Sequence, residues 1–243
     1  MEAATERMQQ LLRKARPQAI ANLVWACATL GYEPVGGFLD AAFSRMQRLL
    51  RKVKPQELAN TVWAFATLGF HPGGDFLQAA AARMLQLLPQ AKPQELASMV
   101  WACARLHHDP GPQFLEAGLA RMQVSLPEAS LQALSMLLWG CARMQHIPSR
   151  TFLEAVADKV VGLLPGAGAQ PIATLCWAFA TLDYQPCGAY VQGCAARFEQ
   201  LLPGVAPVDV RQMRAAYQAW NLHRKYPWLT DRLTDRPWGG EPS

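Results

Sequence analysis

The sequence lacks the signatures of several large classes of protein. None of its apolar runs approaches the roughly 18 residues of a membrane-spanning helix. Nowhere do apolar and polar residues alternate with period two, so no strand is predicted. The glycine-rich segment at residues 165–171 has neither the Lys nor the Ser or Thr of a phosphate-binding loop, and no Gly-x-Ser-x-Gly motif is present. These absences argue against a membrane protein, a β-sheet protein and two common classes of enzyme.

Histidine and cysteine are also poorly arranged for chemistry. Cys187 and Cys194 have no partner ligands nearby, and Cys141 with His146 is only a pair, whereas a zinc site needs three or four ligands. No pair of carboxylates is placed for acid–base catalysis. We therefore expect no catalytic residue, no cofactor, no metal ion and no enzymatic activity.

What the sequence does contain is an internal repeat of 38 residues. Five tryptophans follow it without a slip: Trp25, Trp63, Trp101, Trp139 and Trp177. A Gln and a Pro recur with the same step, and so does a third position filled by Phe or Tyr. A fixed period between about 20 and 50 residues is typical of solenoids and other repeat arrays.

The period divides the chain into repeats. The five full repeats are predicted at residues 17–54, 55–92, 93–130, 131–168 and 169–206. Residues 1–16 match only the second half of a preceding repeat, and residues 207–243 begin like a sixth repeat before diverging into a partial repeat or C-terminal cap. Because 51% of the residues are hydrophobic, the chain has enough apolar side chains for a continuous core.

Each repeat is predicted to be a helical hairpin. In the second repeat the first helix begins at Pro55 and continues through Leu68, and Gly69 ends it. Pro72, Gly73 and Gly74 form the turn, and a second helix runs from about residue 75 to residue 88. One hairpin cannot bury its apolar face alone, so the repeats must stack. The predicted fold is all-α, a right-handed superhelical α-solenoid of 38-residue helical hairpins.

The first helix of each hairpin is predicted to carry a polar stripe. At 100° per residue, Ile20, Val24, Cys27 and Gly31 share a core face, and Trp25 lies on its flank, where the ring packs against the next repeat. The position of Ala26 keeps Ala or Gly, which predicts a shallow floor open to a planar group. The most variable positions of the stripe, and the predicted base-facing residues, are Asn22, Thr29, Asn60, Thr67, Ser98, Arg105, Met136, Arg143, Thr174 and Thr181.

Two interpretations of this stripe stay open for any single residue, namely a solvated surface and a binding surface. A merely solvated helix face is usually rich in Lys and Glu, which are good helix formers. The stripe instead favours Asn, Ser and Thr, whose short side chains suit hydrogen bonding to base edges. Reading about one base per helical repeat with two or three side chains is a known way to recognise single-stranded RNA.

The charge of the chain suits an anionic partner. Its formal net charge is +5 and its pI is about 9.0. A basic position recurs in the second helices at Arg7, Arg45, Arg83, Arg121, Lys159 and Arg197. Because it lies on the apolar side, we expect it to bond carbonyls between repeats rather than to form a phosphate ladder. The predicted phosphate contacts are Arg16, Arg51, Lys52, Lys54 and Lys92, all in the N-terminal half.

The repeated phrase "PQELANTVWAFATLGFHP" resembles the octotricopeptide repeat, a helical-hairpin family of organellar RNA-binding proteins. It is also similar to the leucine-rich region of FAST-kinase-domain proteins, which act on mitochondrial RNA. The resemblance covers residues 1–206, since Pro-Gln, Leu-Ala-Asn, Trp-Ala and Leu-Gly recur in register. The fourth repeat departs from it, because "LQALSMLLWGCARMQ" lacks the Pro-Gln pair and the Asn. The fifth repeat departs as well, because "AQPIATLCWAFATLD" has its Pro two places late.

This resemblance implies sequence-specific binding of single-stranded RNA, an organelle mRNA or rRNA, in control of its stability, processing or translation. It implies a chloroplast or mitochondrial location, with other RNA-processing proteins as further partners and with no membrane partner. The start in mid-repeat without a transit-peptide composition predicts a truncated chain. The alternative is an α-solenoid protein–protein interaction scaffold without RNA binding, which is expected to show aromatic or apolar anchors in its groove.

Overall fold

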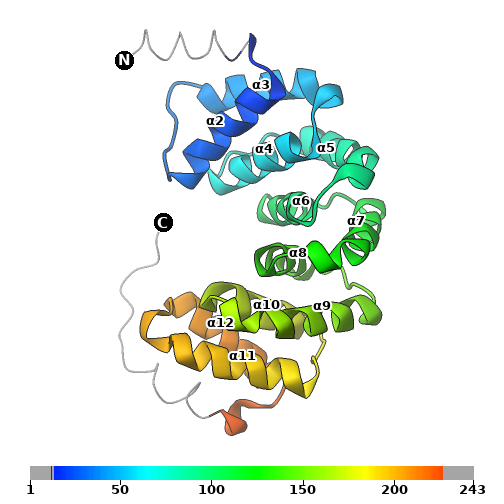
Figure 1. The fold of residues 1–243 in the computed structure, drawn as a ribbon. Coiled ribbons are helices and arrows are strands. Elements are labelled where there is room, and N and C mark those ends of the chain that lie inside the picture. The colour runs from blue at the N-terminus through cyan, green and yellow to red at the C-terminus, as the bar shows by residue number, and fades with distance from the viewer. Residues whose placement is uncertain (1–11, 13, 227–243) are drawn as a thin grey trace. The chain divides into compact units, whose positions relative to one another are not determined.

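The computed structural model describes residue 12 and residues 14–226, and within them the chain is helical with no strand (Figure 1). The first helices of the hairpins are α2 (Pro17–Thr29), α4 (Pro55–Thr67), α6 (Pro93–Arg105), α8 (Leu131–Arg143), α10 (Ala169–Thr181) and α12 (Pro207–Ala219). The second helices are α3 (Phe38–Leu49), α5 (Gly74–Leu87), α7 (Pro112–Val124), α9 (Arg150–Leu163) and α11 (Gly188–Leu201). Most of the predicted half-repeat at residues 1–16 and residues 227–243 of the predicted cap lie outside the described residues.

The first helices begin at intervals of 38 residues because their N-termini share local signals. Proline is the first residue of α2, α4, α6 and α12, where its missing N–H costs nothing. In α4 the Glu57 carboxylate accepts the backbone N–H of Lys54 at 2.8 Å, and Glu95 does the same for Lys92 in α6. Helix α8 lacks the proline and is capped instead by Ser130, whose hydroxyl accepts the Ala133 N–H at 3.1 Å.

The first helices also end in the same way. A residue with φ between 53° and 68° follows each of them, at Gly31, Gly69, His107, Gln145, Asp183 and Asn221. The next N–H donates back across the turn, as from Phe70 to the Phe65 carbonyl at 2.9 Å. This left-handed turn favours glycine, yet only two of the six residues are glycine. The last of these turns, at Asn221, shows that α12 has the structure of a first helix with its terminal turn.

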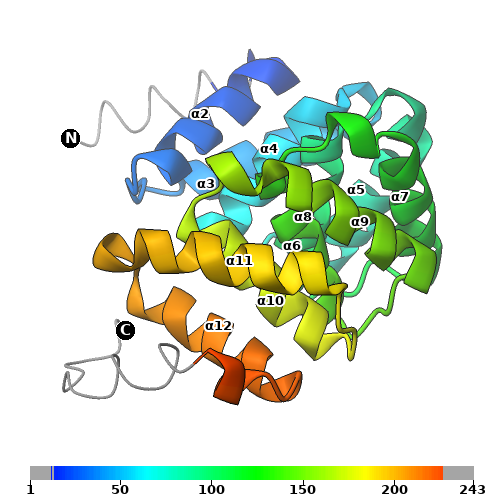
Figure 2. The ribbon, with the colours of Figure 1, turned by 60° about the horizontal axis from the view of Figure 1, so that its bottom comes forward.

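The helices form two compact bodies, α2–α8 and α9–α12, whose boundary falls after Pro148. In the N-terminal body α2, α4, α6 and α8 pack side by side in chain order, and α3, α5 and α7 form a second layer beside them (Figure 1). In the C-terminal body α10 packs on α12, and α9 packs on α11 (Figure 2). The predicted all-α fold of consecutively stacked hairpins is therefore confirmed within each body, while its superhelical handedness stays a prediction.

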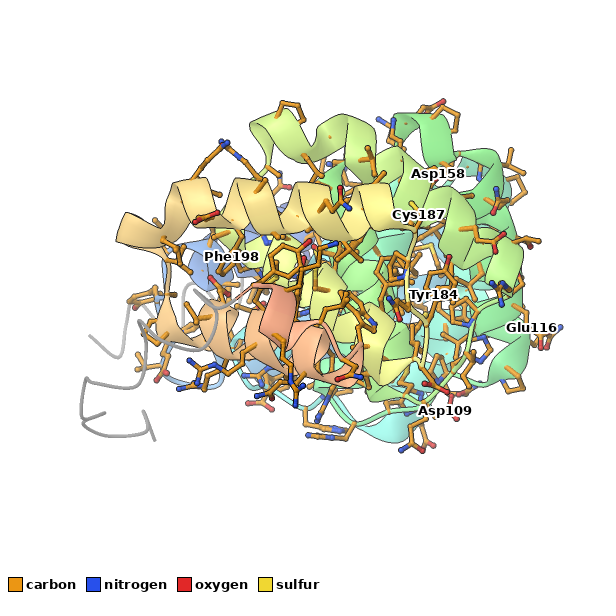
Figure 3. The ribbon with its side chains drawn as sticks, turned by 90° about the horizontal axis from the view of Figure 1, so that it is seen from below. Asp109, Glu116, Asp158, Tyr184, Cys187 and Phe198 are labelled. Carbon is orange, nitrogen blue, oxygen red and sulfur yellow. The ribbon has the colours of Figure 1, made fainter. Side chains whose placement is uncertain are left out.

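The cysteines of the first helices serve as small buried side chains. Cys103 and Cys141 are fully buried, and burial raises the pKa of each thiol to about 12, so neither is a thiolate near neutral pH. Cys187 differs because it is exposed at the start of α11, near Tyr184 in the preceding turn (Figure 3). Phe198 of α11 is fully buried in the same body.

Candidate nucleic-acid interface

Each first helix keeps one face accessible to solvent, which is narrow in α4, α6 and α8 and wider in α2, where Leu23 is also exposed. It is defined by positions separated by four, three and four residues, which fall on one side of an α-helix: Gln18, Asn22, Trp25 and Thr29 in α2. The Gln18 position is exposed in all five repeats: Gln18, Gln56, Gln94, Gln132 and Gln170. We call the surface formed by these four positions in α2, α4, α6 and α8 the recognition face.

Tryptophan occupies the middle of the recognition face. Trp25 is 44% exposed, and its counterparts in the next repeats are half-buried. The ring centroids of Trp63 and Trp101 lie 6.3 Å apart, and those of Trp101 and Trp139 lie 5.9 Å apart, each pair tilted by 36°. The expected packing of the rings between successive repeats is confirmed. Sequence reasoning missed that the same rings reach solvent, although their spacing from the exposed Gln position was a signal for it.

The Thr29 position is exposed in every repeat: Thr29, Thr67, Arg105, Arg143 and Thr181. The Thr29 and Thr67 hydroxyls donate to the carbonyls of Trp25 and Trp63 at 2.9 Å, which leaves their lone pairs free to accept. The Arg143 guanidinium lies 5.9 Å from the ring centroid of Trp139. The structure thus places Thr29, Thr67, Arg105 and Arg143 at the C-terminal end of the recognition face, and Thr181 at the same position of α10 in the other body.

The Asn22 position behaves differently, and the expectation of a uniformly exposed ladder is wrong there. Asn22 is exposed and Asn60 is half-buried, whereas the next three members are buried: Ser98 (7% exposed), Met136 (7%) and Thr174 (6%). The neighbouring first helix covers them. Gln94 Nε2 of α6 donates to Met136 Sδ of α8 at 3.5 Å, and the Thr174 hydroxyl of α10 donates to Gln212 of α12 at 3.5 Å. These three side chains serve helix packing.

The predicted shallow floor at the Ala26 position is also wrong. Ala64, Ala102, Gly140 and Ala178 are buried, so no planar group reaches them from solvent. The position stays small because adjacent first helices approach closely there. A Cβ placed on Gly140 of α8 lies 2.7 Å from Val100 Cγ1 and 3.0 Å from the Val100 carbonyl oxygen of α6. Small residues here permit close packing of helices rather than access by a ligand.

The basic position of the second helices has the structural role that was expected. Its arginines donate to the carbonyl thirty residues earlier, in the segment that leads into the first helix of the same hairpin. The bonds join Arg45 Nε to Ala15 O (3.1 Å), Arg83 Nη2 to Val53 O (3.4 Å), Arg121 Nε and Nη2 to Ala91 O (3.3 and 3.2 Å), and Arg197 Nε to Ala167 O (3.0 Å). Arg7 lies outside the described residues. These four arginines therefore fasten each second helix to the segment that joins its hairpin to the preceding repeat.

The five predicted phosphate contacts are all exposed. Arg16, Lys54 and Lys92 immediately precede α2, α4 and α6, where the helix dipole adds partial positive charge. Ser130 occupies the same place before α8. Arg51 and Lys52 lie in the short 3-10 helix η1 (Leu50–Lys52). The N-terminal body thus has exposed cations at the start of three first helices and, through Arg105 and Arg143, at the end of two.

Two further properties concern the described part of the chain. It contains no group of three or more His, Cys, Asp or Glu side chains placed to hold a metal ion. None of its helices combines the length and the apolar character needed to cross a bilayer.

The family model described as "Tbc2 translation factor, N-terminal domain" matches residues 1–196, which is more than half of the chain. The chain belongs to this family. No curated protein matches it. The Tbc2 N-terminal domain match includes α2–α10 and every position of the recognition face, whereas α12 begins beyond the end of the match.

Proposed function

We propose that this chain binds single-stranded RNA through the recognition face and acts in post-transcriptional control of organelle transcripts, most directly their translation. Membership of a translation-factor domain family supports a role in translation. The octotricopeptide resemblance refines the ligand to RNA and the compartment to a chloroplast or mitochondrion, with RNA-processing proteins as further partners. The exposed, polar and cation-flanked face of the first helices is chemically suited to that ligand.

The observation that carries this proposal is the contrast between constant and variable positions on one exposed face. Gln18 and its counterparts do not change between repeats, so they make the same contact each time, as a contact to ribose or phosphate would require. The Thr29 position holds Thr in three repeats and Arg in two, and it stays exposed in all of them. A position that is exposed everywhere and differs between repeats is the one that discriminates between bases, at about one base per repeat.

A protein–protein scaffold remains the second candidate, because the tryptophans on the recognition face are aromatic anchors of the kind that a peptide groove uses. The charges favour RNA over a peptide. Arg105 and Arg143 follow two of the tryptophans at a spacing of four residues, and exposed basic residues stand before three of the helices. Single-stranded RNA is an extended polyanion with aromatic bases, so it can contact both the tryptophans and the basic residues.

The test is selection of bound RNA from a random pool at two salt concentrations, with the unaltered protein and with Arg105→Ala. We expect a motif of about four nucleotides, one for each first helix of the recognition face, of which Arg105→Ala changes the preference at one position and weakens binding by about 1–3 kcal/mol. Arg48→Ala is the matched control, because Arg48 is an exposed arginine of the second-helix layer in the same body. It should leave the motif unchanged.

Binding without any motif that falls steeply with salt would restrict the interaction to phosphates and contradict base readout. Absence of binding by a folded, helical protein would contradict RNA binding altogether and favour the scaffold.

A further inference from the structure

The tryptophans of the recognition face require an explanation beyond helix packing. Large aromatic side chains that remain partly exposed in a row are unusual, because each retains apolar surface in contact with water. Trp25 is 44% exposed, and Trp63, Trp101 and Trp139 are only half-buried within a layer whose other apolar residues are mostly buried. We call these four residues the tryptophan strip.

Helix α12 shows that the indole is not needed to join first helices. At the position that corresponds to Trp25, α12 has Ala215, and this alanine is exposed. Helix α12 nevertheless packs closely on α10, as α4 packs on α6 and α6 on α8. Close packing of first helices therefore proceeds without a tryptophan on one partner. The ring is present in α2, α4, α6, α8 and α10 and is absent only from α12, the last of the described first helices.

The geometry of the tryptophan strip leaves its solvent-facing side available to a ligand. Ring contacts join Trp63 to Trp101 at 6.3 Å and Trp101 to Trp139 at 5.9 Å. Within the described part of the chain these ring contacts do not extend to Trp25, which is the most exposed of the four. The three contacting rings form a continuous aromatic row across α4, α6 and α8, and each of the three residues keeps part of its surface exposed.

The surroundings of the strip identify its ligand. Arg143 lies over Trp139, so a guanidinium and an indole already present a shared surface to solvent. Arg105 has the same spacing from Trp101, and Lys54 and Lys92 are exposed before α4 and α6. An aromatic row bordered by cations is the arrangement that proteins use to stack the bases of single strands while attracting the backbone.

We propose that the tryptophan strip is a base-stacking surface for single-stranded RNA, on which bases rest against indoles whatever their identity. The inference rests on the proposed RNA-binding function and adds its sequence-independent component. The indoles supply affinity at each repeat, and the neighbouring Thr29 position supplies discrimination. Because every base has a π face, this component tolerates any sequence.

The experiment compares binding of two oligonucleotides of equal length and charge, oligouridylate and an abasic ribose-phosphate chain. The unaltered protein binds the base-containing strand more tightly. Trp101→Leu lowers that affinity by about five- to a hundred-fold and leaves binding of the abasic strand unchanged, because stacking is lost and phosphate contacts remain. Trp101→Tyr retains most of the affinity, since a phenol ring still stacks.

A second variant protects the test against a folding defect. Trp25→Leu removes a ring that is 44% exposed and takes no part in the ring contacts among Trp63, Trp101 and Trp139. We expect it to lower the affinity for oligouridylate and not for the abasic strand. Circular dichroism and thermal melting establish that each variant is folded.

The failures of the two proposals are distinguishable. Equal affinity of the unaltered protein for both strands, with no effect of Trp101→Leu or Trp25→Leu on either, overturns the stacking inference but leaves RNA binding in place. Absence of binding to both strands overturns the RNA-binding function itself. An equal loss for both strands in folded Trp101→Leu assigns the ring a structural role and also overturns the inference.

Discussion

The two helix layers of the N-terminal body use their repeated polar residues for opposite purposes. In the second-helix layer the arginines at the Arg45 position do not vary, and each of the three donates to a backbone carbonyl in the segment that leads into the first helix of its hairpin. In the first-helix layer the Thr29 position varies and faces solvent. A charged residue that is the same in every repeat can therefore serve to hold the helices together. A polar residue that varies between repeats on an exposed face is the better candidate for recognition.

The layers also differ in how tightly their helices pack. First helices lie against each other along small residues, and Gly140 of α8 has no room for a side chain against Val100. In the second-helix layer, a Cβ placed on Gly118 of α7 meets no atom of another element within 4 Å. The recognition face is narrow on α4 and α6 because close packing of the first helices covers both flanks of these two helices.

The largest expected effect comes from adding volume between first helices. Gly140→Val places side-chain atoms against Val100, whose backbone cannot move aside easily, so we expect a loss of about 1–3 kcal/mol in the free energy of unfolding. Urea unfolding followed by circular dichroism measures it. Gly118→Ala is the matched control in the other layer and should be neutral or stabilising by up to about 1 kcal/mol. Equal effects of the two substitutions would contradict the difference in packing.

An intermediate effect is expected for the arginine of the second-helix layer. Arg121→Leu removes both donors to the carbonyl of Ala91, which is fully buried, and the unfolding free energy should fall by about 1–2 kcal/mol. RNA affinity per folded molecule should not change, in contrast to Arg105→Ala, which should change affinity and not stability. A loss of RNA affinity in a fully stable Arg121→Leu protein would instead make this position a phosphate ladder.

The smallest expected effect on stability comes from the turn that joins the two helix layers. Burial lowers the pKa of His108 below its usual value of 6.5, assisted by nearby His71 and opposed by Asp109. Because the unfolded chain binds this proton more readily, the contribution to stability is present above about pH 6.5 and is lost as the pH falls through the folded-state pKa. Melting temperatures measured from pH 7.5 to about pH 5 should therefore decline.

His108→Phe is the control for this pH dependence. Phenylalanine occupies the same repeated position at Phe70, where its ring contacts Phe65 at a centroid distance of 5.0 Å, so the substitution suits the turn. The melting temperature of the variant should fall less between pH 7.5 and about pH 5 than that of the unaltered protein. An unchanged decline would assign the pH dependence to other groups.

Much of the fold could be predicted from the order of residues. The predicted first helix from Pro55 through Leu68 differs by one residue from α4, and the second, predicted from about residue 75 to residue 88, is displaced by one residue from α5. The carbonyl-binding role of the second-helix arginines was also predictable, because a charged residue on an apolar stripe must find a buried partner. The candidate site could be predicted from the sequence only in part. The exposed Thr29 position was predicted, but the burial of Ser98 and Met136 and the exposure of the tryptophans were not.

The sequence by itself determined the period and the ends of the helices, since prolines, capping groups and the left-handed turn act within a few residues of the chain. Only the tertiary structure decided which strip of each first helix meets solvent. A helical wheel shows which residues share a side, but the covering surfaces come from helices 38 residues earlier and later in the chain. Helices α4 and α6 have first-helix neighbours on both flanks and a second layer behind, so most of their circumference is buried, and Trp63 and Trp101 lie on the part that remains.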